Sequence, residues 1–156
     1  MSPLIFLLPL FASLLHVGEE FVWPGGFLAW HRRYRPELSR SITARNAIVL
    51  NAVLIAACLV LAGWGSVMSS GLSLWLVITS ILAVNAVFHF LGMIRLRRYS
   101  PGVVTGVLVS VPLCLWGFQH VLGNGAVGPR MAIESLLLGA SYQLWSMLHH
   151  RLRARE

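Results

Sequence analysis

The stretch LSLWLVITSILAVNAVFHFLGMI, residues 72–94, decides the fold class of this chain. It runs for 23 residues without one Asp, Glu, Lys or Arg. A helix needs about 20 mostly apolar residues to cross the hydrocarbon core of a bilayer. The stretch therefore predicts a transmembrane helix, and a membrane protein around it.

Four more apolar runs of similar length lie on either side of this stretch. Of the 156 residues, 57% are hydrophobic and only 11% are charged, which is too little charge for the surface of a soluble domain. We predict an all-α, polytopic membrane helical bundle of about five transmembrane helices, forming a single domain over residues 1–156. The predicted spans are 4–22, 46–68, 72–94, 102–122 and 131–148.

The charges predict the orientation of the bundle. All 12 basic residues are arginines, and they gather at residues 31–45, 95–101 and 149–156, with only Arg130 elsewhere. The net charge of +7 is thus divided among loops between apolar runs, which argues against nucleic-acid binding. The positive-inside rule places these three clusters in the cytoplasm, with the amino terminus outside and the carboxy terminus inside. We expect a multi-pass protein of the inner (cytoplasmic) membrane.

Several polar side chains lie inside the predicted spans, where ionisable groups are costly and usually functional. Glu19 and Glu20 follow His16 by three and four residues, so all three share one helical face, as do Asn85 and His89, which are four apart. At a rise of about 1.5 Å per residue, several of these groups fall in one layer, roughly 7–9 Å from the cytoplasmic ends. The four residues at this depth are His16, Asn51, His89 and Tyr142.

Two histidines and a carboxylate in a dry layer predict a metal site. A His₂Glu set holds zinc in some hydrolases, and two histidines with one carboxylate also suit non-haem Fe(II). We predict a divalent metal, zinc or iron, held by His16, His89 and one of the two glutamates, with Glu20 as the preferred ligand. Glu19 and Glu20 are the candidate catalytic carboxylates, since the one that is not a ligand is free as a general base. The predicted supporting residues are Asn51, Asn85 and Tyr142.

Structural interpretations of the same residues remain open. Each histidine could simply hydrogen-bond between helices, and the glutamates could pair with Arg95 or Arg97. A second polar set near the opposite face contains His120 and Glu134, which could meet across a short turn and tie two helix ends together.

The polar motifs also resemble a known family. His16-Val17-Gly18-Glu19-Glu20 followed by Trp23-Pro24, the pair Asn85 and His89, and the segment Tyr99-Ser100-Pro101-Gly102 are similar to the HXXEE-domain membrane proteins. The resemblance implies a small bacterial membrane protein in which His16, Glu19, Glu20, Asn85 and His89 are defining residues. It does not imply a particular reaction.

The favoured function is a small membrane enzyme, a metal-dependent hydrolase that acts on a lipid-like substrate near the headgroup region. Oxidation by Fe(II) is the second choice of chemistry. A transporter or proton relay is the rival class, and a non-catalytic accessory subunit is the third. Membrane lipids are the expected partners, and the sequence leaves the oligomeric state open.

Overall fold

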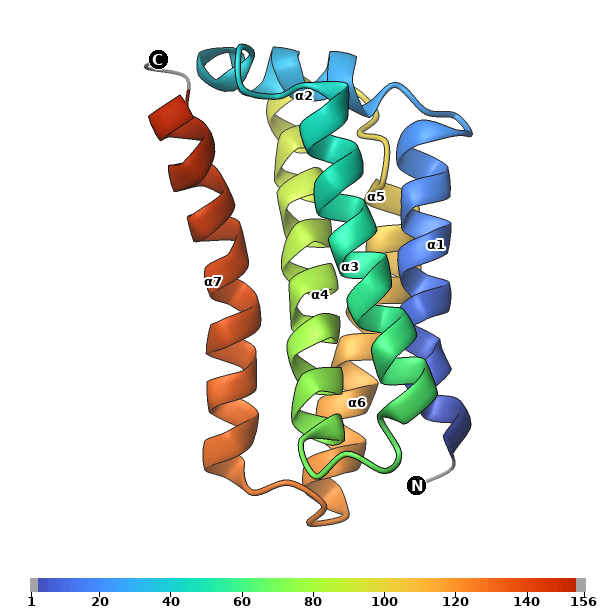
Figure 1. The fold of residues 1–156 in the computed structure, drawn as a ribbon. Coiled ribbons are helices and arrows are strands. Elements are labelled where there is room, and N and C mark those ends of the chain that lie inside the picture. Colours follow the sequence, from blue (N-terminus) through green and yellow to red (C-terminus); the bar gives the residue numbers. More distant parts are fainter. Residues whose placement is uncertain (1–2, 154–156) are drawn as a thin grey trace.

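The computed structural model describes residues 3–153, and these residues form a bundle of α-helices (Figure 1). The all-α class is confirmed. The last residues of the predicted basic tail, 154–156, lie outside the described residues. The main elements are η1 (Pro3–Leu7), α1 (Leu8–Phe21), α2 (Phe27–Tyr34), η2 (Pro36–Leu38), α3 (Ala44–Trp64), α4 (Gly71–Leu96), α5 (Val103–Thr105), η3 (Gly106–Ser110), α6 (Val111–Gly123) and α7 (Pro129–Arg153).

Four helical segments of the described chain are long and apolar enough to cross a membrane. They are Pro3–Phe21, Ala44–Trp64, Gly71–Leu96 and Val103–Gly123, which correspond to the first four predicted spans. The run predicted as the fifth span is also a helix, α7, but it is not among these four. A fifth crossing therefore stays a prediction.

The fourth segment changes its helical pitch near its middle. Pro112 has no backbone N–H to offer the carbonyl four residues before it, so the ordinary helical ladder cannot pass through this point. The chain responds with the π-helical turn η3, in which the Val111 N–H bonds to the Gly106 carbonyl. Gly106 lies against Ala86 of α4, and a β-carbon on Gly106 would approach that methyl group to 2.7 Å. The absence of a side chain at this glycine allows the two helices to pack closely.

Helix α4 is the centre of the bundle and contacts the other long helices. Its buried face includes Trp75, Leu76, Ile78 and Leu82, each no more than 2% exposed. Helix α7 packs against α4 at Gly139, where an added β-carbon would lie 2.5 Å from the Ser80 β-carbon. Such close approach at a small residue is typical of helix pairs in membranes.

The loop predicted at residues 31–45 is more ordered than a simple basic connection. Helix α2 and the short η2 turn fold across one end of the bundle (Figure 1). Trp30 and Tyr34 of α2 are buried, and a β-carbon at Gly92 of α4 would collide with both rings. The aromatic side of α2 therefore covers the end of α4.

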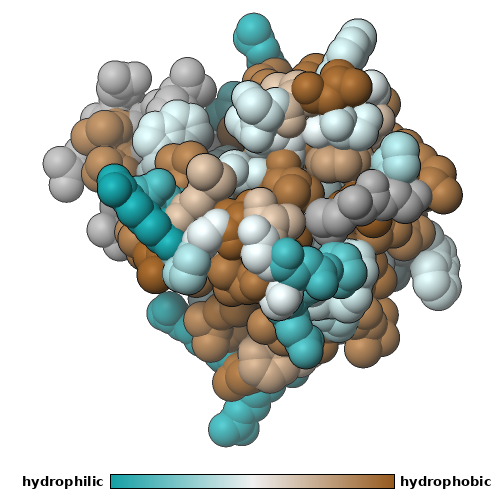
Figure 2. All heavy atoms as spheres, turned by 90° about the horizontal axis from the view of Figure 1, so that it is seen from below, coloured by the Kyte–Doolittle hydropathy of each residue, from teal (hydrophilic) through white to brown (hydrophobic). Residues whose placement is uncertain are grey.

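The two ends of the bundle differ in charge. The arginines of residues 32–45 and 95–98 lie at the end capped by α2, where α7 also finishes (Figure 1). The opposite end, which holds the turns after α3 and α6, shows hydrophilic residues scattered among hydrophobic and intermediate ones (Figure 2). Among the described residues its charged pair is Arg130 with Glu134.

The packing at Gly139 predicts a position-specific loss of stability. Gly139→Ala should lower the free energy of unfolding by about 1–3 kcal/mol, because the new methyl group overlaps the backbone and Ser80 of α4. Gly63→Ala in α3 is the matched control, since its β-carbon would meet nothing within 4 Å. Thermal unfolding in detergent micelles measures both; equal midpoints for the two variants would contradict the packing described here.

Candidate metal centre

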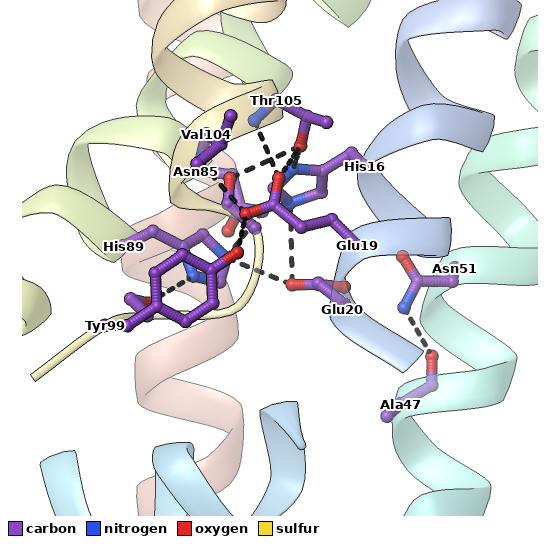
Figure 3. A network of polar contacts seen from close by, with 12 residues as sticks. His16, Glu19, Glu20, Ala47, Asn51, Asn85, His89, Tyr99, Val104 and Thr105 are labelled. Atoms are coloured by element: carbon purple, nitrogen blue, oxygen red, sulfur yellow. Dashed lines mark hydrogen bonds and ion pairs between the residues drawn. The ribbon is translucent and has the colours of Figure 1, made fainter. Parts of the chain in front are cut away.

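Three buried side chains from α1 and α4 converge on one point (Figure 3). Glu20 Oε1 lies 3.5 Å from His16 Nε2 and 3.0 Å from His89 Nε2. His16 and Glu20 are each 3% exposed, and His89 is fully buried. The edges of a tetrahedron with metal–ligand bonds of about 2.0–2.1 Å measure roughly 3.4 Å. The spacing is thus one that could hold a metal ion.

Each imidazole is held by a hydroxyl group on its other nitrogen. His16 Nδ1 lies 3.1 Å from Thr105 Oγ1, and His89 Nδ1 lies 2.9 Å from Ser100 Oγ. Partners of this kind orient metal-binding histidines and fix which nitrogen carries the proton. Asn85 supports the same pair, with its amide nitrogen 2.9 Å from His16 Nε2 and 3.4 Å from His89 Nε2.

Glu19 points away from the histidines, toward the start of helix α5. Its carboxylate accepts hydrogen bonds from the backbone N–H groups of Val104 at 3.0 Å and Thr105 at 2.7 Å. The hydroxyls of Thr105 and Tyr99 donate to it as well. The first N–H groups of a helix have no partner within the helix and carry partial positive charge. Glu19 therefore caps the α5–α6 segment from a different helix.

Tyr99 lies in the connection between two apolar helices and completes this cap. Partial burial and the Glu19 carboxylate raise the pKa of Tyr99 above its ordinary value. The phenol therefore keeps its proton and remains a donor to Glu19 across the neutral pH range.

The cap also orients the His16 ring. A threonine hydroxyl has one proton, and Thr105 Oγ1 lies 2.5 Å from Glu19 Oε2 but 3.5 Å from the Gly102 carbonyl. The proton consequently goes to Glu19, and Thr105 must accept from His16 Nδ1–H. The other ring nitrogen, Nε2, then faces Glu20 and the amide of Asn85.

Gly102 is the backbone position that lets the two imidazoles approach. Its φ of +100° lies in the left-handed region, which favours glycine. A β-carbon there would lie 2.7 Å from His16 Cε1 and 3.0 Å from His89 Cε1. Both the turn and the space beside the histidines therefore require glycine.

No arginine in the described part of the chain pairs with either glutamate. The ion pairs of the described arginines are Arg35 with Glu37 and Arg130 with Glu134, and Arg95 lies over the Tyr34 ring. Glu19 is satisfied by four hydrogen bonds instead. Glu20 has only the two imidazoles, so its buried negative charge calls for a cation or a proton at the cluster.

A small polar cavity of about 100 Å³ lies beside the cluster. His16, Glu20 and Asn85 form part of its wall, together with the predicted supporting residues Asn51 and Tyr142. Asn51 donates to the Ala47 carbonyl of its own helix and makes no contact with the ligand atoms. The volume corresponds to roughly three water molecules. Of the four residues predicted at one depth, His16 and His89 therefore belong to the His–Glu–His cluster, whereas Asn51 and Tyr142 line the cavity beside it.

Several residues at this site were not predicted as part of it from the sequence. Thr105 and Ser100 hold the histidines, and His31 of α2 is buried on the cavity wall. Hydroxyl residues are common in membrane helices, so sequence alone offers no signal that separates these two. His31 stands in an arginine-rich segment that indicates a solvated loop, although the aromatic residues around it were a usable sign of burial.

The second polar set does not come together as expected. Within the described chain, Glu134 pairs with Arg130 at 2.8 Å, and both side chains are exposed. His120 instead stacks on Trp116 and lies beside Asn124. The structure therefore gives each of the two predicted partners a different neighbour.

Fold and site together define a class: a helical protein with four helices suited to a membrane and a buried His–Glu–His cluster between two of them. The chain belongs to the family described as "Protein of unknown function with HXXEE motif", which matches residues 7–117. It is also similar to the uncharacterized protein YrkK of Bacillus subtilis (strain 168), at 26% identity over 135 residues, or 83% of this chain and 82% of that protein. No solved structure matches. The resemblance inferred from the motifs is confirmed.

The cap by Glu19 leads to a testable prediction. Glu19→Gln should lower the free energy of unfolding by about 1.5–3 kcal/mol, because an amide cannot accept hydrogen bonds from all four donors and carries no charge. Glu134→Gln is the control, since its exposed pair with Arg130 contributes less than about 1 kcal/mol. Denaturation of the purified variants in detergent measures the difference, and a Glu19→Gln protein as stable as the control would exclude the capping role.

Proposed function

We propose that this protein is a membrane-embedded, metal-dependent hydrolase that uses the His16–Glu20–His89 cluster on a lipid-like substrate. The observation that carries the proposal is the convergence of three buried ligand atoms within 4.8 Å of one another. A bound zinc or iron ion would supply Lewis-acid activation of water and of the bond to be cleaved.

The chain's own residues supply the remaining parts of a hydrolytic site. The contacts of Glu20 all involve Oε1, so Oε2 remains for accepting a proton from water at the polar cavity. In the reaction, the water oxygen bonds to the carbonyl carbon or phosphorus of the substrate, and the bond to the leaving oxygen breaks. Glu20 passes the water proton to that leaving oxygen. Among the two catalytic candidates, we assign Glu20 to proton transfer and Glu19 to positioning, because four donors already occupy Glu19.

The substrate class follows from where the cluster lies. The ligands sit about one to two helical turns inside the arginine-bearing end of the bundle. We propose that this end faces the cytoplasm, that the amino terminus is outside, and that the protein resides in the inner membrane. A substrate whose reactive bond lies at the boundary between headgroup and acyl chain would then reach the cavity.

We further propose that α7 is a fifth crossing. It returns from the end where α6 finishes to the end capped by α2, alongside α4 (Figure 1). Large apolar side chains on it are exposed, which suits contact with lipid. Examples are Leu137, Leu138 and Leu144.

A proton relay has less support than a hydrolase. A relay needs polar groups that continue through the bundle, but the buried hydroxyls of Thr79 and Ser80 donate to carbonyls of their own helix. At the far end, His120 and Glu134 are engaged by other neighbours. These contacts leave the His–Glu–His cluster as a local site.

Metal analysis tests the proposal directly. Protein purified in mild detergent should contain about one zinc or iron ion per chain. His16→Ala, Glu20→Ala and His89→Ala should each remove it, whereas His120→Ala at the other end of the bundle should retain it. Elemental analysis by mass spectrometry measures the content. Wild-type protein without stoichiometric metal, or ligand variants that keep it, would refute the metal centre.

The hydroxyl that holds His16 gives a second, graded test. Thr105→Val keeps the shape of the side chain but removes the acceptor for His16 Nδ1–H, so metal affinity should fall roughly 10–100-fold. Thr79→Val is the control, because Thr79 also lies inside a long helix, but its hydroxyl donates to backbone carbonyls of α4 and does not contact the cluster. Competition with a chromogenic chelator measures both affinities. An equal loss in the two variants would point to general destabilisation.

A further inference from the structure

A large apolar groove runs along the bundle between α3, α4 and α7. Helix α7 packs against α4 and stands away from α3 (Figure 1), and the space between them is a groove of about 800 Å³. This volume lies within the roughly 300–1,000 Å³ that is usual for small-molecule sites. The residues that line its deeper part are apolar, among them Val53, Ala57, Leu74, Val77 and Ile78.

The groove adjoins the cavity beside the His–Glu–His cluster. Both are lined by the same five residues: Asn46, Leu50, Leu54, Ile81 and Tyr142. The cavity alone is too small for a lipid. A molecule whose tail lies in the groove could nevertheless bring a polar linkage up to Glu20 and His16.

One charged residue lines the groove, and it lies at the end nearest the metal centre. Arg45 stands in the first turn of α3, and it pairs with no carboxylate of the described residues. From Arg45 to Ala57 is twelve residues, or about 18 Å of helix. Half of a bilayer's hydrocarbon core is about 15 Å thick. The groove thus has a cation at its surface end and an apolar wall about one leaflet long.

We propose that the groove binds an acyl chain of an anionic membrane lipid, which enters sideways between α3 and α7 and places its headgroup at Arg45. Charge and length favour this occupant over a helix of another protein, which would not need a cation at one end only. The inference deepens the proposed function and rests on it for the identity of the reacting bond. Binding of the acyl chain in the groove does not itself require a metal.

Photolabelling of the full chain tests the groove. The probe is a phosphatidylglycerol that carries a diazirine midway along one acyl chain, added to nanodiscs of phosphatidylcholine that contain the purified protein. Peptide mapping by mass spectrometry should place the label on the groove-facing residues Val53, Ala57 and Val77. Label spread evenly over the lipid-facing sides of the helices would overturn the inference.

Two pairs of variants make the test specific. Ala57→Trp fills the groove and should reduce this labelling at least about tenfold, whereas Ala56→Trp, on the exposed side of the same helix, should not. Arg45→Gln should weaken labelling by phosphatidylglycerol but not by a phosphatidylcholine probe, with Arg40→Gln in the nearby loop as its control. Equal labelling in Ala57→Trp and Ala56→Trp overturns the proposal, as does a protein–protein cross-link in the groove.

Metal content measured on the same samples separates this inference from the proposed function. Groove labelling in protein that holds no metal would support the lipid site and refute the hydrolase. Stoichiometric metal in protein that is labelled only at random would do the reverse. Loss of labelling in Ala57→Trp with the metal retained would support both.

Discussion

The constraint on which the structure depends is the burial of two adjacent carboxylates, Glu19 and Glu20, in an apolar bundle where no described arginine pairs with them. Each carboxylate must therefore find its compensation in other polar groups, most of them on other helices. Glu19 takes it from the first N–H groups of α5, and Glu20 takes it from His16 and from His89 of α4. These contacts hold α1 against α4 and α5, because an unsatisfied buried charge costs several kcal/mol.

Adjacent positions on one helix make this division possible. Successive residues point about 100° apart, so Glu19 and Glu20 face different neighbours although they share one turn of α1. Gly102 lies beside both His16 and His89, and its missing β-carbon leaves room for the two imidazoles. One turn of α1 and one glycine therefore set the positions of α4 and α5 at this end of the bundle.

The sequence predicted the parts of this arrangement that depend on length and helical periodicity. Apolar runs located the helices to within a few residues, and three- and four-residue spacings grouped His16 with Glu20 and Asn85 with His89. The same spacings could not separate Glu19 from Glu20, because they fix a face but not which helix lies opposite it. Thr105 could not be predicted as a partner of His16 either, because its role depends on an 89-residue separation closed by packing.

The hydroxyl of Thr105 shows why the two glutamates are not redundant. Because the only hydroxyl proton of Thr105 is donated to Glu19, Thr105 accepts a hydrogen bond from His16 Nδ1–H, and His16 Nε2 faces Glu20. The amide nitrogen of Asn85 lies 2.9 Å from His16 Nε2. Glu20 Oε1 lies 3.5 Å from this nitrogen and 3.0 Å from His89 Nε2, so the three candidate ligand atoms meet in one buried space. Glu19 thus orients His16 through Thr105, whereas Glu20 contacts both histidines directly.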